Sequence, residues 1–468
     1  MIDGINPYPA YKDSGVPWLG SVPEHWVVDR GKWLFGHKKD LNADGRQTNI
    51  LSLTLRGVVN NDPDNPEGLV PKDYRTYQRF EKGDLVFKLI DLENLRTSRV
   101  GLVHEDGIMS SAYVRLVRRH GGVQRFFFHQ YFDLYQRGIF NQLGAGVRST
   151  LGPKDLVDLP ILIPQNPEQA AIVHFLDHAD RRIRRYIAAK KNLTALLNEQ
   201  KQVTINSAVT RGLDPSVRLK PSGVEWLGDI PAHWEVVRAK RLFSPRRDLA
   251  LPGDVQLSAT QAYGVIPQAE FEAKVGRRVV KISMHLEQRR HVEKGDFVIS
   301  MRSFQGGLER AWASGAIRSS YVVLKRAPLV DVGFFSYLFK SRGYIRALQA
   351  TADFIRDGQD LNFGNFCDVG LPLVPLDEQK AIAASISGLT ADIDVALAHT
   401  EREIALVREY RARLISDVVT GRLDVREAAE RLPDEPEQPE PNDGPDAMTD
   451  TDDEIADDTN AVGEQVEV

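Results

Sequence analysis

The sequence contains the same thirteen-residue motif twice. SGVPWLGSVPEHW runs from Ser14 to Trp26 and SGVEWLGDIPAHW from Ser222 to Trp234, with nine of thirteen positions identical and an offset of 208 residues. Further segments recur in the same order with offsets between 208 and 212: EKGDLVF and EKGDFVI, SAYVRL and SSYVVL, LPILIPQNPEQAAI and LPLVPLDEQKAI, TRGLD and TGRLD. Self-similarity at a fixed period indicates a repeated structural unit. The chain is therefore predicted to be a two-fold duplication of a unit of about 210 residues.

Length and composition narrow the class of protein. At 468 residues the chain is long enough for two or three domains with their own cores. The single cysteine, Cys367, excludes intrachain disulfides and cysteine-rich zinc sites and indicates a reducing compartment. The N-terminus shows no signal peptide, and no apolar run approaches the ~20 residues that span a bilayer. We expect a cytoplasmic protein without a membrane partner.

The net charge of −5 conceals two oppositely charged parts. From Leu432 onward the chain holds 14 acidic residues and no Lys or Arg, so the preceding residues carry 60 basic and 51 acidic side chains, a net of +9. A segment rich in Pro, Asp and Glu buries too little apolar surface to fold, so residues 422–468 are predicted to form an acidic disordered tail. The basic body suits a nucleic-acid partner, although mildly basic domains are also common.

Each repeat begins with the pattern of a mixed α+β domain. Short alternating or apolar runs predict strands, among them GDLVFKLI and SAYVRLV in the first copy and GDFVISM and SYVVLKR in the second. A helical pattern follows in each copy, RFFFHQYFDLYQRGIF and VGFFSYLFKSRGYIRALQ. Residues 1–165 and 212–374 are therefore predicted to contain two domains of about 150 residues, which is a common domain size.

A long helix is predicted after each domain. Asn166 can cap the first, Pro167 suits its first position, and no Pro or Gly follows until Gly212. Apolar residues recur at alternating steps of 4 and 3, the 3.5-residue period of a coiled coil. We predict helices over 166–211 and 375–421, with these residues in the seams: Ile172, Leu176, Ala179, Ile183, Tyr186, Lys190, Leu193 and Leu197; and Ile382, Ile386, Leu389, Ile393, Ala396, Val407, Tyr410 and Leu414.

Helices of ~42 residues, hence ~63 Å long, need a partner for their apolar stripes. If a pseudo-two-fold axis relates the copies, the two helices run antiparallel and bury their seams against each other. The fold class is then α+β: two tandem mixed α/β domains joined by two long antiparallel coiled-coil helices. The alternative, in which each helix packs only on its own domain, is less favoured because such helices are seldom this long.

The sequence offers no recognisable catalytic centre. It has neither a G-x-x-x-x-G-K-[ST] phosphate loop nor a G-x-G-x-x-G that opens a helix after a strand. His174 and His178 have i,i+4 spacing, but no third metal ligand accompanies them. His25 and His233 recur beside tryptophans, and their position after a proline favours packing over catalysis. We therefore expect no catalytic residue, no metal site and no bound cofactor in this chain.

Basic side chains in the two domains are the candidates for contacting DNA. Arginine suits both bidentate contact with guanine and the binding of phosphates, although any one of these residues could equally be an ordinary surface charge. The segments between the shared motifs diverge most, RTSRVGLVHEDGIM against MRSFQGGLERAWASGAI, as expected for two readers of different sequences. The candidates are Arg56, Lys88, Arg96, Arg99 and Arg148 in the first domain, and Arg302, Arg310, Arg318 and Arg356 in the second.

The doubled SGV-x-WLG-x-x-P-x-HW motif, the LP…P…EQ entries into long helices and the closing GLD and RLD resemble the specificity subunit of type I restriction-modification enzymes. The resemblance covers residues 11 to about 426, and an acidic tail is not part of the family pattern.

This resemblance implies that each domain is a target recognition domain that reads half of a bipartite, asymmetric double-stranded DNA site. The helices would fix the spacer and, with their flanks, dock two modification (methyltransferase) subunits, which restriction/translocase subunits would join. S-adenosylmethionine, ATP and magnesium would be bound by those partners, and this chain would be non-catalytic. An orphan DNA-binding or coiled-coil scaffold without restriction activity is the alternative, and a hidden nuclease or methyltransferase centre is a third.

Overall fold

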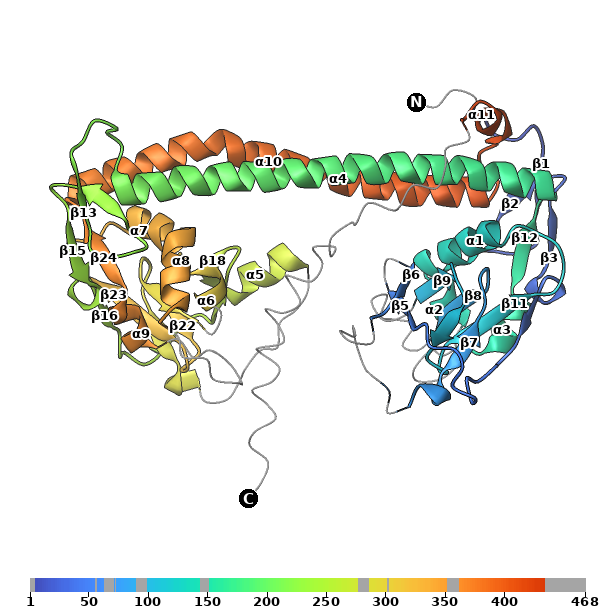
Figure 1. Cartoon of the computed structure of the whole chain (residues 1–468), viewed down its shortest axis with the longest axis horizontal. Helices are drawn as coiled ribbons and strands as arrows, with labels where there is room; N and C mark the ends of the chain where they lie inside the picture. The colour runs from blue at the N-terminus through green and yellow to red at the C-terminus, as the bar shows by residue number, and fades with distance from the viewer. Residues whose placement is uncertain are drawn as a thin grey trace, which may run out of the picture. The chain divides into compact units, whose positions relative to one another are not determined.

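A computed structural model describes residues 5–54, 57–62, 71, 73–89, 99–143, 151–276, 286–300, 303–351 and 362–433. The chain divides into two compact units. Unit 1 comprises the described residues of Met1–Ala188 and Glu403–Pro441, and unit 2 comprises those of Ala189–Arg402. Each unit therefore contains one α/β domain together with parts of both long helices (Figure 1).

Unit 1 is built on a four-stranded antiparallel sheet with the order β4-β11-β8-β9. Its strands are β4 (Phe35–His37), β11 (Val114–Arg118), β8 (Leu85–Lys88) and β9 (Arg99–Leu102). Helix α1 (Gln124–Gln136) packs on the core through the buried rings of Phe126, Phe127 and Tyr131. Two-stranded pairs complete the unit: β1 (Tyr11–Asp13) with β2 (Ser21–Pro23), β3 (Val27–Arg30) with β12 (Pro160–Ile163), β5 (Leu51–Thr54) with β6 (Gly57–Asn60), and β7 (Gln78–Phe80) with β10 (Gly107–Met109). Short helices are η1 (Gly31–Trp33), η2 (Tyr74–Thr76), α2 (Ile139–Leu143) and α3 (Pro153–Asp158).

Unit 2 repeats this arrangement strand for strand. Its four-stranded sheet has the order β16 (Phe243–Pro245), β23 (Val322–Arg326), β20 (Phe297–Ile299) and β21 (Glu309–Arg310). The pairs are β13 (Leu219–Pro221) with β14 (Asp229–Pro231), β15 (Glu235–Arg238) with β24 (Gly370–Leu373), β17 (Leu257–Thr260) with β18 (Gly264–Pro267), and β19 (Arg290–Val292) with β22 (Gly315–Ile317). Its shorter helices are η3 (Ala239–Arg241), α5 (Gln268–Val275), η4 (Leu286–Gln288), α6 (Ser303–Gly306), α7 (Val332–Phe339), α8 (Arg342–Gln349) and α9 (Phe363–Asp368). The equivalence confirms the internal duplication.

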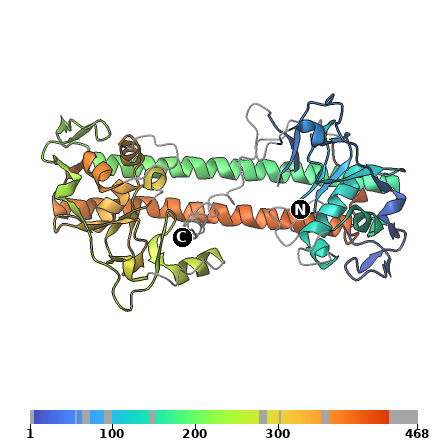
Figure 2. The same ribbon diagram turned by 90° about the horizontal axis from the view of Figure 1, so that it is seen from below.

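The two long helices are α4 (Asn166–Arg211) and α10 (Leu376–Val419), and within each unit they lie side by side (Figures 1 and 2). In unit 1 Arg411 forms an ion pair with Asp180, and the Tyr186 hydroxyl lies 3.3 Å from Glu403 Oε2. The later residue of α4, Tyr186, contacts the earlier residue of α10, Glu403. The two helix segments are therefore antiparallel, as predicted. In unit 2 Lys201 of α4 forms an ion pair with Asp394 of α10.

Both ends of the helix pair are buried in hydrophobic cores. In unit 1 Phe175 of α4 and Val418 of α10 share one core with Trp26, and in unit 2 Val209 of α4 and Ile386 of α10 share another with Trp234. Fully burying a large apolar side chain contributes about 1.5–3 kcal/mol. These cores therefore hold each helix end to its domain.

The middle of the predicted seam is wrong in register. Tyr186 and Leu193 of α4 are 42% and 41% exposed, whereas Ile187 is buried. On α10 Leu389 is 60% exposed and Thr390 is buried beside it. An α-helix has 3.6 residues per turn, so a strict 3.5-residue repeat drifts by about 20° per heptad and moves to the edge of the interface.

The predicted disordered tail, 422–468, begins too early. Asp424 forms an isolated bridge with Asn6, and its backbone N–H donates to the Asn6 carbonyl at 2.7 Å. Helix α11 (Arg426–Glu430) follows, and Val425 and Ala428 are buried in the core of unit 1. The predicted tail rested on acidic composition, which gave no indication of the short apolar face formed by Val425, Ala428 and Ala429. Residues 434–468 lie outside the described residues.

Helix α10 is, by length and composition alone, apolar enough to cross a membrane, which the sequence analysis overlooked. One such helix is weak evidence, because a core helix of a soluble protein passes the same test. Ile382, Ile386 and Val418 of α10 are fully buried against the two domains. Only 17% of the apolar stretch of α10 is buried, however, so this packing accounts for a minor part of it.

Candidate nucleic-acid interface

The repeated HW motif anchors the first turn of each long helix. Trp26 and Trp234 are fully buried. His25 Nε2 lies 2.9 Å from Glu168 Oε2 in the first turn of α4, and His233 Nε2 lies 2.9 Å from Glu378 Oε2 in the first turn of α10. These matched contacts support the packing interpretation of the motif over a catalytic one.

In unit 1 two further residues, Tyr8 and Arg426, contact the glutamate of this anchor, Glu168. The Tyr8 hydroxyl donates to Glu168 Oε1 at 2.8 Å, and burial together with this bond raises the pKa of Tyr8. The Arg426 guanidinium lies over the Tyr8 ring at 5.3 Å and pairs with Asp424 at 2.6 Å. These contacts form a stabilising network around Glu168.

The predicted DNA-contacting residues are only partly placed by the structure. Lys88 at the end of β8 is half-buried and is the cross-strand neighbour of Arg99, whose side chain is not described. Arg310 lies on β21, and Arg318 follows β22. The remaining candidates lie outside the described residues: Arg56, Arg96, Arg148, Arg302 and Arg356. Their roles stay predictions.

Arg310 is held between an aromatic ring and the interior of unit 2. Its guanidinium carbon lies 4.0 Å from the centre of the Trp312 ring, and Trp312 is 49% exposed. Arg310 ends β21 and Trp312 follows two residues later, so the ring lies close enough for this stacking. Burial lowers the pKa of Arg310, and its Nε is buried without a hydrogen-bond partner among the described residues.

The β17–β18 hairpin packs directly against this pair. A Cβ at Gly264, where φ is +72°, would lie 2.7 Å from the Arg310 carbonyl oxygen and 2.9 Å from Trp312 Nε1. Only glycine therefore fits at this turn. The neighbouring Tyr263 ring is 39% exposed and has Lys274 Nζ 5.2 Å from its centre.

Exposed aromatic rings paired with cations are a common surface for nucleic acids, because bases stack on the rings and phosphates attract the cations. Arg310 was predicted from the sequence, whereas Trp312, Tyr263 and Lys274 were not. The available signal was the Arg-Ala-Trp spacing in LERAWAS, which brings a cation and an indole to the same side of an extended segment.

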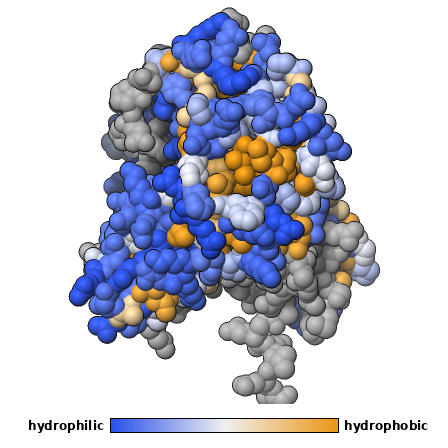
Figure 3. Space-filling view, turned by 90° about the vertical axis from the view of Figure 1, so that its right-hand side faces the viewer, coloured by the Kyte–Doolittle hydropathy of each residue, from blue (hydrophilic) through white to orange (hydrophobic). Residues whose placement is uncertain are grey.

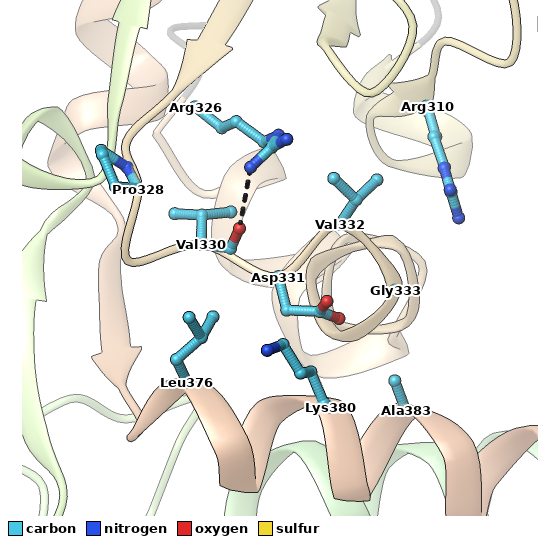
Figure 4. A pocket seen from close by; sticks show the side chains of 10 residues that line it. All are labelled: Arg310, Arg326, Pro328, Val330, Asp331, Val332, Gly333, Leu376, Lys380 and Ala383. Atoms are coloured by element: carbon cyan, nitrogen blue, oxygen red, sulfur yellow. Dashed lines mark hydrogen bonds between the residues drawn. The ribbon is translucent and has the colours of Figure 1, made fainter.

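A pocket of about 380 Å³ adjoins Arg310 in unit 2 (Figure 4). Arg326 at the end of β23, Asp331 before α7 and Lys380 in α10 line it together with Arg310. Arg326 donates from Nη1 to the Val330 carbonyl at 3.4 Å, and Asp331 Oδ1 accepts from the Phe334 N–H at 2.9 Å. Three cations and one carboxylate thus face a common space. Among the described residues, no group of three or more His, Cys, Asp or Glu side chains is placed to hold a metal ion.

Unit 1 carries an apolar patch over β3 and β12 (Figure 3). Val27 is 53% exposed and is the cross-strand partner of the half-buried Ile163. The counterpart of Val27 in unit 2, at the offset of 208, is the charged Glu235 opposite Leu373. An exposed apolar patch of this kind is typical of a protein interface, and here it is confined to one of the two equivalent strand pairs.

The architecture defines a class of protein: tandem copies of one α/β domain, each joined to two long antiparallel helices. The same architecture is found in a solved structure described as the basis of complex assembly and conformational transition of the type I restriction-modification system, with a TM-score of 0.56, 13% identity and coverage of 85% of this chain and 98% of that chain. This chain shares its fold with that chain of the type I restriction-modification system.

Two further structures match over similar lengths. They are the HsdS subunit from Thermoanaerobacter tengcongensis (TM-score 0.38, 15% identity, 86% of this chain and 98% of that chain) and a type I restriction-modification S subunit from M. genitalium (0.33, 14%, 84% and 96%). Their TM-scores are too low to add to the assignment. No model of a known protein family matches the chain.

Proposed function

We propose that this chain is the non-catalytic, DNA-reading subunit of a type I restriction-modification complex, and that each unit reads one half of a bipartite, asymmetric site. The observation that carries the proposal is the duplicated framework with unlike side chains at equivalent surface positions. Unit 2 has Arg310 and Trp312 on and beside β21, whereas the equivalent strand β9 of unit 1 has Leu102 in the place of Arg310. Two copies of one scaffold with different polar surfaces suit two different half-sites.

The partners follow from the same proposal. Two modification subunits would dock on the long helices and their flanks, where Leu196, Val203 and Leu406 are each more than 60% exposed, and on the apolar patch over β3 and β12. Restriction/translocase subunits would join them. S-adenosylmethionine, ATP and magnesium would be bound by these partners, and the complex would act in the cytoplasm. An orphan scaffold without restriction activity is the alternative, which the absence of neighbouring modification and restriction genes would favour.

A footprint of the chain bound with its modification subunits tests the proposal. Two protected segments separated by an unprotected spacer are expected, and a single contiguous footprint would contradict bipartite reading. Trp312→Ala should weaken protection of one half-site and Lys88→Ala that of the other, because each residue belongs to a different unit. Lys325→Ala, which removes an exposed lysine on β23, serves as the control for loss of a positive charge and should leave both halves protected.

A further inference from the structure

Three cationic side chains line one pocket of unit 2. They are Arg310 on β21, Arg326 on β23 and Lys380 in the second turn of α10 (Figure 4). We propose that this pocket, of about 380 Å³, binds a phosphate group. The ligand is either a phosphate of the DNA backbone, which would deepen the proposed function, or a free phosphate-bearing small molecule, which would be independent of it.

The charges in the pocket leave a positive surplus. Its single carboxylate, Asp331, caps α7, because Oδ1 accepts from the Phe334 N–H at 2.9 Å, and its negative charge offsets one of the three cations. The Lys380 ammonium has only a loose contact, 3.8 Å from Oδ1 of the fully exposed Asp377. Three cations against one carboxylate favour an anionic ligand.

Arg310 supplies a donor that lacks an acceptor. Its Nε is buried without a hydrogen-bond partner in the part of the chain that the structure describes. A buried donor without a partner is costly, so such groups in native proteins generally have a protein, water or ligand acceptor. A phosphate oxygen in the adjoining pocket would meet this need and bind to a guanidinium that stacking on Trp312 already orients.

The equivalent place in unit 1 lacks these charges. Arg310 is the cross-strand partner of Phe297, the residue after Asp296 of EKGD, whereas Leu102 is the partner of Leu85, the residue after Asp84 of EKGD. Leu102 is therefore the structural counterpart of Arg310. Lys380 follows Gln379 and its counterpart, Ala170, follows Gln169; the two glutamines accept equivalent backbone N–H bonds, from Asp331 and Val123.

Only the third cation is shared. Arg326 and its counterpart Arg118 both donate to a backbone carbonyl, of Val330 at 3.4 Å and Gly122 at 3.2 Å, so this arginine has a structural task in both units. The two additional cations, Arg310 and Lys380, are particular to unit 2. Since the same framework folds in unit 1 with leucine and alanine, the substitutions Arg310→Leu and Lys380→Ala are compatible with the fold.

Inorganic phosphate is the probe for the first experiment, with binding to the full chain measured by calorimetry or by ³¹P line broadening. Wild type is expected to bind phosphate saturably at one site, and the Arg310→Leu/Lys380→Ala variant at least tenfold more weakly. The control is Lys325→Ala, which removes an exposed lysine next to Arg326 on β23 and should bind like wild type. Circular dichroism checks that the variants remain folded.

The second experiment identifies the source of the phosphate. Each phosphate contact adds about 0.9 to the slope of log K for DNA binding against log salt concentration. If the pocket takes a DNA phosphate, the double variant, in complex with the modification subunits, loses about one unit of slope; if it takes a free phosphate compound, the slope is unchanged while phosphate binding is lost. A wild-type chain that binds no phosphate, together with an unchanged slope in the variant, overturns the proposal. The phosphate experiment uses no DNA, so a failure of bipartite DNA reading would be seen separately in the footprint.

Discussion

In both units a buried aspartate of the EKGD turn pairs with an arginine, but the two arginines come from different positions in the domain. In each, the aspartate of EKGD accepts the N–H of its own turn: Glu81 N donates to Asp84 Oδ2 at 2.7 Å and Glu293 N to Asp296 Oδ2 at 3.0 Å. Each aspartate also pairs with a buried guanidinium. In unit 1 this is Arg115 of β11, at 2.6 Å.

In unit 2 the guanidinium is that of Arg246, which follows β16 and lies 2.7 Å from Asp296. At the offset of 208 the counterpart of Arg115 is Val323, and that of Arg246 is Lys38. A buried carboxylate needs a partner but does not specify which strand supplies it. Both copies therefore contain the ion pair, but the arginine lies on β11 in unit 1 and directly after β16 in unit 2.

The largest effect is expected from breaking this pair in unit 1. Arg115 is 1% exposed, so Arg115→Val leaves Asp84 buried without its cation and should cost about 3–5 kcal/mol of the free energy of unfolding. Burial already raises the pKa of Asp84, against the effect of Arg115. Hydrogen exchange followed by mass spectrometry, read on peptides from β8, measures the loss in unit 1 and leaves unit 2 as an internal reference.

A rescue variant tests whether the position of the arginine is interchangeable. Adding Lys38→Arg to Arg115→Val places a guanidinium where unit 2 has Arg246 and should restore part of the lost protection. Lys38→Arg alone is the control and should change little, because Lys38 is exposed. No recovery in the double variant would show that the two units differ in more than the origin of the cation.

A second comparison concerns the glycines that end the long helices. Gly212 after α4 and Gly421 after α10 have almost equal φ values, +75° and +76°. A Cβ at Gly421 would lie 2.4 Å from Pro23 Cδ and 3.1 Å from Trp26 Cη2, whereas one at Gly212 would approach its nearest neighbours, Glu378 and Trp234, only to 3.4 and 3.5 Å. The helix end is packed more tightly against the HW motif in unit 1.

Alanine at these two positions should therefore differ in effect. Both substitutions incur the cost of a left-handed backbone, about 1–2 kcal/mol. Gly421→Ala adds overpacking against the rigid proline ring, about 1–3 kcal/mol more. Urea unfolding of the two single variants measures the difference, and equal losses would mean that Pro23 moves aside freely.

The sequence was sufficient to predict the architecture because its signals are local or repetitive. The doubled HW motif marks the beginning of each domain, and the absence of Pro and Gly between Pro167 and Gly212 predicts a helix that the structure contains. The middle of the seam was not predictable from the heptad count, since the drift of a real helix brings Ile187 rather than Tyr186 inside.

The candidate site was less accessible to sequence reasoning for a physical reason. The pocket joins Arg310 to Lys380, two residues 70 positions apart that come together only through packing of α7 against α10. Gly333 makes that approach possible, since a Cβ there would lie 3.1 Å from the Ala383 methyl carbon. Lys380 lies in α10, for which the sequence pattern predicted only an apolar seam. That pattern gives no sign that Lys380 belongs to a site.

The smallest of the expected differences between the units concerns acid. His129 on α1 is buried in unit 1, and burial, with smaller contributions from Arg125 and Arg411 that outweigh Asp180, lowers its pKa to about 3. Its counterpart at the offset of 208 is Tyr337, which has no imidazole. At this position only unit 1 has an imidazole, and burial keeps the ring of His129 neutral when the unfolded chain becomes protonated.

Between the unfolded-state pKa of about 6.5 and the folded-state value of about 3, the unfolded chain binds a proton that the folded chain does not. Stability therefore falls as the pH is lowered through this window, by about 1.4 kcal/mol between pH 7.5 and pH 5.5. His129→Gln should remove this part of the acid sensitivity, whereas His120→Gln, at an exposed position, should retain it. Urea unfolding at pH 7.5 and 5.5 measures the change for each protein, and an equal acid loss in wild type and His129→Gln would mean that the buried ring accepts a proton in the folded state.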